Sequence, residues 1–532
     1  MQGVMAAGSQ QTAATGAAIL ERGGNAVDAA VAAAFVSFMS EIGVVHLGGS
    51  GVAQIYDPHT QQSVVYDFFS AMPGRGNGRP NHELDFNEVT IDFGATTQSF
   101  HLGRGSVAVP GNVYGLCALA ADYGRLPLAT LLEPAIALAE NGVVLDEFQA
   151  NTCELLRPLY THTAGMRQIF TPQGHMLRGG ERLFVPHLAE SLRELAVAGG
   201  SWMRSGRLAQ ALVSDQLAYG GLLTTADLAE YEVRRMPPIR ICYRDYDVLL
   251  PPPCSSGGVL TAFTLKLLSH YDVQRRPYGS AAHLQLLYEV MAATSRARPV
   301  WERMADEDEA GAVAAFLADD FVAEYVAQVQ AAITGRQPAV SLVEESGPAN
   351  TTHLSVIDSD GMAVSMTTTA GESAGYVVPG TGFIPNNILG EEDVNPRGFH
   401  NWTAGQRIAT MMTPMFVTQE GHIRLVVGSG GSVRIRSAVL QVLSNLLDYR
   451  MTLNEAVNRP RVHVENMALQ CEWGIDPEAM DELESWGYPV NRWPTRSIYF
   501  GGAHSVSRTP EGRLVPAGDN RRGGAVAMVN RK

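Results

Sequence analysis

The sequence predicts a large globular fold in which helices and strands alternate. Apolar residues make up 45% and charged residues 17% of the 532 positions, which is enough apolar material for a large core and too little charge for a disordered chain. The first half of the chain alternates helical patterns with short runs of strand-like alternation. A polar, proline-containing linker at residues 334–350 separates this half from a second series of strand, loop and helix patterns.

The first half predicts helices packed around short strands. Residues 26–39 (AVDAAVAAAFVSFM) form a continuous apolar run, which predicts a buried helix. Alternating apolar residues predict strands, and apolar residues at spacings of three and four before a glycine predict helices. The strands are residues 51–57 and 63–69, and the helices are residues 112–124 and 127–142. Residues 73–105 are crowded with Gly, Asn and Pro and predict a long surface excursion.

The second half predicts a hairpin and then a strand that leads into a helix. A helical run at residues 310–333 precedes the linker. Residues 352–369 alternate on both sides of Asp360-Gly361, a pair that suits a tight turn between two strands. Residues 422–450 predict a strand, a glycine loop and a long amphipathic helix.

Charge and cysteine content narrow the classes of partner. The formal charge is -15 at pH 7 and no cluster of Lys and Arg stands out, so nucleic acid is not an expected partner. The five cysteines are scattered, which favours a reducing compartment over a disulfide framework. No secretory signal is visible, so we expect a cytoplasmic protein, or a periplasmic or secreted one if a signal was trimmed. No membrane span is expected, because residues 26–39 are shorter than the roughly 20 residues that a span needs.

Serine, metal and dinucleotide motifs are weak in this sequence. Residues 371–375 (GESAG) match the G-x-S-x-G turn that presents a nucleophilic serine, here Ser373. That turn needs a helix directly after it, whereas the next residues are extended and contain a proline. The histidines lack the short spacing of zinc ligands, and residues 428–433 lack the last glycine of a dinucleotide fingerprint. We therefore expect no metal and no organic cofactor.

The glycine loop and Thr351 indicate a different chemistry. Gly430 and Gly431 directly precede the predicted long helix, where free backbone N–H groups can stabilise developing negative charge. A threonine hydroxyl becomes nucleophilic beside a base, and the α-amino group of an N-terminal threonine is such a base. Cleavage between Asn350 and Thr351 would create that amine at a strand start. From the pattern alone, a strand-forming threonine is the simpler interpretation.

Segments along nearly the whole chain match one family, in the order in which that family has them. Residues 350–358 (NTTHLSVID) have the pattern of a processing site. Further matching segments are GNAVDAAVAAAF, VAVPGNVYGL, LLEPAIALAENG, TTADLAEYEVR, PPPCSSGG, VVPGTGFIPNN and GSGGSVRI. On these segments the sequence closely resembles the γ-glutamyltranspeptidase family, which belongs to the N-terminal nucleophile hydrolases.

The resemblance implies a fold and a maturation step. The implied fold is α+β, a four-layer αββα sandwich of the N-terminal nucleophile hydrolase type. The precursor would cleave itself into a large subunit, residues 1–350, and a small catalytic subunit, residues 351–532, which interleave in one αββα unit. By position in the motifs, the nucleophile, the hydroxyl that positions it and the two amides that hold the oxyanion are Thr351, Thr369, Gly430 and Gly431.

At the substrate-binding positions the sequence departs from the family. Phe69 stands where the family has the Arg that binds the substrate α-carboxylate, and Ile388 stands in place of a Gln. Gly371 replaces an Asn, and Met411 replaces one of two serines that also contact the carboxylate. Each lost charge-assisted bond is worth roughly 1.5 to 3 kcal/mol, so the sequence predicts a rebuilt glutamyl pocket.

Two substrate-binding positions keep their chemistry. Glu391 corresponds to the acidic residue that holds the substrate α-amino group, and Thr410 keeps the hydroxyl of the first serine. Arg407 and Arg434 are nearby cations that could replace the missing Arg, although ion pairing within the fold is the simpler role for both.

The leading hypothesis is a self-processing amide hydrolase or acyltransferase that cleaves γ-glutamyl, glutathione-type amides through an acyl-threonine intermediate. The alternative is a hydrolase of a different small acidic amide on the same scaffold. A catalytically silent scaffold and a serine hydrolase that uses Ser373 are further options. The sequence leaves open whether water, an amino acid or a peptide accepts the acyl group, and whether the protein is a homo-oligomer.

Overall fold

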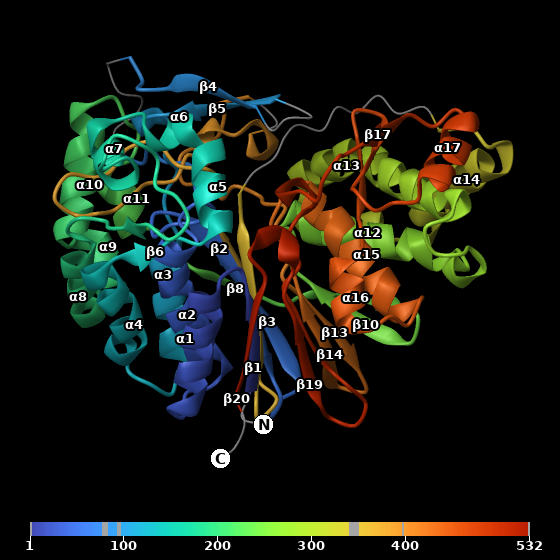
Figure 1. Ribbon diagram of the computed structural model, residues 1–532, viewed down its shortest axis with the longest axis horizontal. Coiled ribbons are helices and arrows are strands. Elements are labelled where there is room, and N and C mark those ends of the chain that lie inside the picture. Colours follow the sequence, from blue (N-terminus) through green and yellow to red (C-terminus); the bar gives the residue numbers. More distant parts are fainter. Residues whose placement is uncertain (1–2, 77–82, 93–96, 340–349, 396–397, 530–532) are drawn as a thin grey trace.

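Two antiparallel sheets lie at the centre of the computed structural model, which describes residues 3–76, 83–92, 97–339, 350–395 and 398–529 (Figure 1). In spatial order, the seven-stranded sheet consists of β20 (Ala525–Val529), β1 (Gly3–Ala7), β11 (Thr352–Asp358), β12 (Ala363–Thr369), β2 (Ser50–Asp57), β3 (Gln62–Phe68) and β8 (Arg234–Met236). The six-stranded sheet consists of β19 (Leu514–Ala517), β18 (Ser505–Arg508), β14 (His422–Val427), β13 (Met415–Gln419), β10 (Tyr246–Leu250) and β9 (Ile239–Tyr243).

The two sheets pack face to face through a buried apolar layer. Val4 and Ile357 from the first sheet share one cluster with Phe416 and Val426 from the second. Side chains alternate between the two faces of a strand, so Met5, the neighbour of Val4, points the other way and joins the helix-side core. The central strands β1, β11 and β12, which are buried throughout, therefore have one face toward the second sheet and one toward helices.

Helices cover the outer face of each sheet, which gives four layers in the order αββα (Figure 1). The helices beside the seven-stranded sheet are α1 (Gln10–Glu21), α2 (Ala26–Ser40), α3 (Asn112–Tyr123), α4 (Leu128–Asn141), α5 (Glu147–Leu155), α6 (Arg157–Tyr160), α7 (Ala164–Phe170), α8 (Leu188–Ala198), α9 (Ser201–Ser205), α10 (Arg207–Ala218) and α11 (Thr225–Ala229). Those beside the six-stranded sheet are α12 (Ser256–Ser269), α13 (Ala281–Phe316), α14 (Asp319–Gly335), α15 (Arg434–Leu447), α16 (Leu453–Asn458) and α17 (Pro477–Ser485). The α+β fold with αββα layering is confirmed.

Local sequence explains the central helix α2. Every residue from Ala26 to Ser40 is buried, as the apolar run predicts. Asn25 and Asp28 form a capping box, in which each side chain accepts a hydrogen bond from the backbone N–H of the other. The helix is therefore fixed at its start and packed on all sides. No helix in the described ranges is both long and apolar enough to cross a membrane.

The predicted surface excursion is only partly irregular. Within residues 73–105, β4 (Asn87–Asp92) and β5 (Thr97–Leu102) form an antiparallel hairpin. Phe100 and Leu102 are fully buried in the helix-side core, so alternation in TQSFHL outweighs the many turn-forming residues around it. The predicted helix at 310–333 is also divided: α13 ends at Phe316 and α14 begins at Asp319. Most of the linker lies outside the described residues.

Segments on both sides of residue 350 build both sheets. β11 and β12 lie between β1 and β2 in the first sheet, and β10 pairs with β13 in the second. The two predicted subunits thus interleave in one body, and the division between them at residue 350 stays a prediction. Smaller two- and three-stranded pieces lie outside the central sheets: β6 (Val143–Val144), β7 (Arg182–Leu183), β15 (Val462–Glu465), β16 (Ala468–Cys471) and β17 (Val490–Arg492).

Candidate active site

Thr351 directly precedes the central strand β11 and is almost completely buried. The register of the β11–β12 hairpin pairs Thr352 with Thr368, so Thr369 at the end of β12 lies beside Thr351. The turn fixes this register: Gly361 has a φ of 92°, and the Asp358 carboxylate accepts hydrogen bonds from two backbone N–H groups of the turn. The hairpin thereby brings the two threonines together.

The Asn350–Thr351 peptide group is held by side chains at the end of β12 and just after it. The Thr369 hydroxyl donates to the carbonyl oxygen of Asn350 at 2.7 Å and accepts from the Gly371 N–H at 3.0 Å. Glu372 accepts from the backbone N–H of Asn350 at 2.8 Å and from its side-chain amide at 2.7 Å. The carbonyl, the backbone N–H and the side chain of Asn350 are therefore all fixed.

The glycine loop between β14 and α15 packs directly on the nucleophile strand. A Cβ atom on Gly430 would lie 2.0 Å from the Thr351 carbonyl oxygen, so only glycine fits there. Gly431 has a φ of 118°, a conformation that favours glycine, and α15 begins three residues later at Arg434. The loop therefore lies at a helix N-terminus beside Thr351, the place where backbone N–H groups can stabilise an oxyanion.

Sequence reasoning missed Arg522, which touches the nucleophile residue. Its Nη1 donates to the Thr351 carbonyl oxygen at 3.0 Å, and its Nη2 donates to the carbonyl of Ile498 at 3.1 Å. Burial lowers the pKa of Arg522 to about 10, with a further contribution from the neighbouring Arg434. No motif or spacing in the sequence marks this arginine, because it lies in the 3-10 turn η6 (Asn520–Arg522), far from Thr351 along the chain.

A buried ion network fixes the turn that carries Arg522. Asp519 pairs with Arg461 at 2.6 Å and with Arg521 at 3.0 Å, and Arg521 also pairs with Glu472 at 2.5 Å. All four side chains are almost completely excluded from solvent. Arg461 and Arg521 hold the pKa of Asp519 well below its ordinary value even though burial opposes this. Because these four charges are paired with one another, the network affects the site by holding Arg522 in position.

Glu41 lies behind the nucleophile strand on the opposite face. Its carboxyl accepts hydrogen bonds from the hydroxyls of Thr352 and Thr12, the latter at 2.5 Å. Burial raises the pKa of Glu41 to about 7, although the hydroxyl bonds oppose the shift. Since Thr352 directly follows Thr351, this carboxyl anchors the start of β11.

Two of the substitutions that distinguish this chain from the family meet in one place. Phe69 and Ile388 are buried in a single apolar cluster with Met412 and Ile435. The side chains of Phe69 and Ile388 are apolar and each about 1% exposed, so neither can bind a polar group of a substrate. We call this apolar group the Phe69 cluster. The rebuilding of a glutamyl pocket stays a prediction.

The remaining predicted substrate residues surround the loop after β12. The Glu391 carboxyl lies next to Gly371, because a Cβ atom added to Gly371 would lie 2.3 Å from a carboxyl oxygen of Glu391. The Thr410 hydroxyl accepts the backbone N–H of Met412 at 3.2 Å, and Met411 lines a cavity of about 520 Å³ beside the Phe69 cluster. The structure thus brings Glu391 to the loop after β12, while Met411 borders the cavity and Thr410 directly precedes Met411.

Arg407 and Arg434 have structural partners. Arg407 pairs with the buried Asp67 at 3.3 Å and donates to the hydroxyl of Tyr231 at 2.5 Å. Arg434 donates to the carbonyl of Tyr499 at 2.7 Å, and its guanidinium lies over the ring of the same residue. Ion pairing and stacking within the fold account for both arginines.

Ser373 does not have the geometry of a nucleophile elbow. It is fully buried, and its hydroxyl accepts the backbone N–H of Gly375 at 3.2 Å. No helix begins between residues 374 and 387, so the strand–turn–helix context of the elbow is missing from this described stretch.

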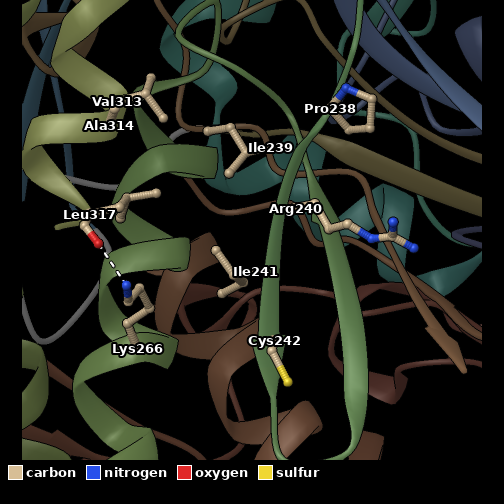
Figure 2. A pocket seen from close by; sticks show the side chains of 9 residues that line it. All are labelled: Pro238, Ile239, Arg240, Ile241, Cys242, Lys266, Val313, Ala314 and Leu317. Carbon is tan, nitrogen blue, oxygen red and sulfur yellow. Dashed lines mark hydrogen bonds between the residues drawn. The ribbon is translucent and has the colours of Figure 1, made fainter. Parts of the chain in front are cut away.

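A second groove lies away from these residues, along the edge strand β9 (Figure 2). It encloses about 670 Å³ between β9, α12 and α13. Figure 2 shows Ile239 and Ile241 on the side of the groove and Arg240 turned away, and Lys266 donates to the carbonyl of Leu317. None of the predicted site residues lines this groove, so the candidate active site does not include it.

The αββα layering, with a threonine at the start of a central strand and a glycine loop beside it, defines an N-terminal nucleophile hydrolase. The family model for gamma-glutamyltranspeptidase matches residues 12–529. The chain belongs to this family, whose members are hydrolases and transferases, and it is therefore an enzyme of that kind.

Relatives and solved structures agree with this assignment. The chain is 33% identical to an acylase ACY 1 proenzyme of a Pseudomonas species (strain V22), over 99% of this chain and 94% of that protein. It is 29% identical to a glutathione hydrolase proenzyme of Bacillus subtilis, over 100% of this chain and 92% of that protein. A cephalosporin acylase structure from Bacillus halodurans superimposes with a TM-score of 0.84 at 24% identity, covering 100% of this chain and 96% of the other, which supports the fold.

Proposed function

We propose that the chain cleaves itself before Thr351 and then hydrolyses small amides whose acyl group lacks the α-amino-acid end of a γ-glutamyl group. The Thr351 hydroxyl attacks the acyl carbon and passes its proton to its own α-amino group. Backbone N–H groups of Gly430 and Gly431 stabilise the oxyanion. The α-ammonium then returns the proton to the leaving nitrogen as the C–N bond breaks, and water hydrolyses the acyl-threonine ester.

The Phe69 cluster is the observation that carries this proposal. A γ-glutamyl substrate brings a carboxylate that needs charged or polar partners, and charge-assisted bonds contribute roughly 1.5 to 3 kcal/mol each. In this chain two of the expected partner positions, Phe69 and Ile388, are buried among apolar side chains. A carboxylate against such a surface loses its hydration without compensation. The structure therefore favours an acyl group that lacks this end.

A cavity of about 520 Å³ lies beside the Phe69 cluster. Cys254 and Ile408 of that cluster line it, together with Met411 and with charged side chains such as Arg298, Glu302 and Arg303. Met411 belongs to a segment that resembles a substrate-binding segment of the family, so we propose that the end of the substrate farthest from Thr351 lies in this cavity.

A series of nitroanilides tests the acyl preference directly. The γ-glutamyl, glutaryl and hexanoyl nitroanilides differ in the α-amino and carboxylate groups of the acyl chain. Cleavage between Asn350 and Thr351 is first verified by intact mass, and Thr351→Ala serves as the inactive control. We expect kcat/KM for the hexanoyl compound, which has neither group, to exceed that for the γ-glutamyl and the glutaryl compounds at least tenfold. A preference for either compound that carries the carboxylate would overturn the proposal.

The retained Glu391 favours a second candidate, γ-glutamyl hydrolysis or transfer. This carboxyl lies beside the loop after Thr369, where it could hold a substrate α-ammonium group. In the same series, this candidate predicts fast γ-glutamyl turnover that glycylglycine accelerates and that Glu391→Gln abolishes.

A further inference from the structure

Two oppositely charged side chains flank the nitrogen atom of Thr351. Arg522 is bonded to the carbonyl oxygen of Thr351, which is three covalent bonds from the nitrogen of the same residue. Before cleavage Glu372 is bonded to the backbone N–H of Asn350, which is also three bonds from the Thr351 nitrogen. Its own backbone N–H donates to the Asn387 side chain at 2.7 Å, a bond that cleavage leaves intact. Ordinary bond lengths place each charged group about 4 to 6 Å from the Thr351 nitrogen. This is the range in which a charge changes the proton affinity of its neighbour.

The Arg522 guanidinium donates to backbone carbonyl groups. In the described part of the chain, no carboxylate oxygen lies within the 4 Å of an ion pair, and its hydrogen bonds go to two backbone carbonyls. Its Nε atom is buried and has no hydrogen-bond partner there. The side chain is 4% exposed, so water does little to screen it. Its positive charge therefore acts most strongly on the residues that it contacts, which include Thr351.

We propose that Arg522 and Glu372 set the proton affinity of the Thr351 α-amino group in opposite directions, Arg522 lowering it and Glu372 raising it. This rests on the proposed function, because the amine exists only after cleavage. An amine that acts as a base near neutral pH must be unprotonated there, and an adjacent cation favours that state. Glu372 limits the effect, so the amine still accepts the proton of the hydroxyl and later passes it to the leaving nitrogen. Arg522 and Glu372 are thus positioning residues, because they act through the Thr351 amine and not on the substrate.

Other charged groups near the site act less on this amine. Arg434 faces Glu465, Asp519 is neutralised by Arg461 and Arg521, and Glu391 lies beyond the loop at Gly371. Glu41 lies on the opposite face of β11 and contacts Thr352, and His353 is buried, which holds its pKa well below the ordinary range and keeps its ring uncharged. Arg522 and Glu372 are therefore the two side chains that bracket the amine, and the α-carboxylate that cleavage creates on Asn350 acts in the same direction as Glu372 for as long as it stays beside Thr369.

The test is the pH dependence of kcat/KM in three variants, with whichever nitroanilide of the series above the native enzyme cleaves best. The acid limb of this profile reports the free-enzyme amine. Arg522→Gln removes the cation and should move the limb about one pH unit upward, and Glu372→Gln should move it about one unit downward. Arg522→Lys keeps the charge and should restore the native limb, and Arg513→Gln, at an exposed position, controls for net charge.

Intact mass separates the outcomes. If the native chain is not cleaved, or if Thr351→Ala is active, the proposed function itself fails. If the native enzyme is cleaved and active but neither variant moves the limb, only the present inference is overturned. If only one of the two variants is cleaved, the acid limb of that variant tests the inference. A shift in the direction given above supports it, and no shift or the opposite shift overturns it. If neither is cleaved, both side chains serve cleavage or folding, and the inference is overturned.

Discussion

The hydroxyl of Thr369 is placed to accelerate self-cleavage, and Thr369→Val removes it while preserving shape. When the Thr351 hydroxyl attacks the carbonyl carbon of Asn350, negative charge develops on the oxygen to which Thr369 donates at 2.7 Å. The Gly371 N–H occupies an acceptor site of the same hydroxyl, which directs its proton to that oxygen. Removal of one such donor costs about 2.7 to 4 kcal/mol in comparable oxyanion sites. We therefore expect cleavage to slow about 10²- to 10³-fold.

The assay follows the precursor through time by intact mass and denaturing gel electrophoresis. Thr369→Ser keeps the hydroxyl and should cleave at close to the native rate. Thr368→Val is the matched control, because Thr368 is also buried in β12 but its side chain points to the opposite face. Thermal melting of each precursor shows whether the fold is intact. Cleavage of a folded Thr369→Val precursor within about twofold of the native rate would refute the reasoning.

Three further predictions concern the supports of the site. Gly430→Ala should abolish activity, because its Cβ would lie 2.0 Å from a backbone oxygen, whereas Gly335→Ala, with open space around it, should not change activity. Burial raises the pKa of Glu41 to about 7, so the folded protein holds a proton that the unfolded chain releases from about pH 4.5. The free energy of unfolding should therefore fall by about 3 kcal/mol between pH 5 and 8, and calorimetry should find this slope flattened in Glu41→Gln. Asp519→Ala breaks a buried network and should cost about 3 to 5 kcal/mol in chemical denaturation, against less than about 1 kcal/mol for Asp481→Ala in an exposed pair.

The strands, turn and helix around the candidate site could be predicted from the sequence because they depend on local pattern, whereas the roles of Thr351 and the glycines come from the family resemblance. Alternation around Asp360-Gly361 predicts the hairpin, and the short turn then fixes which residue of β12 lies beside Thr351. Likewise, a strand, a glycine loop and an amphipathic helix in succession predict the surroundings of Gly430. In each case neighbours in the sequence are neighbours in the structure.

The charged groups around Thr351 could not be predicted because the sheet order brings them from distant segments. Arg522 follows Thr351 by 171 positions and reaches it through the turn before β20. Glu372 lies in the GESAG motif, whose match to a serine elbow suggests a different role for the segment. The hairpin of β4 and β5 could not be predicted for a local reason. Only six residues of β5 alternate, and the many turn-forming residues around them predict a loop instead.

The reaction and the substrate preference of this enzyme depend on different parts of the structure. In the proposed mechanism the oxyanion groups are backbone N–H groups and the base is a backbone nitrogen, so few side chains can alter the chemistry without a change of main-chain geometry. The proposed acyl pocket is built from side chains, and Phe69, Ile388 and Met412 come from three separate segments that meet only in the fold. Substitution at these positions changes which acyl group fits while Thr351, Thr369 and the glycine loop keep their positions. This separation explains how a chain can keep the whole catalytic frame of the family and lose its carboxylate-binding groups.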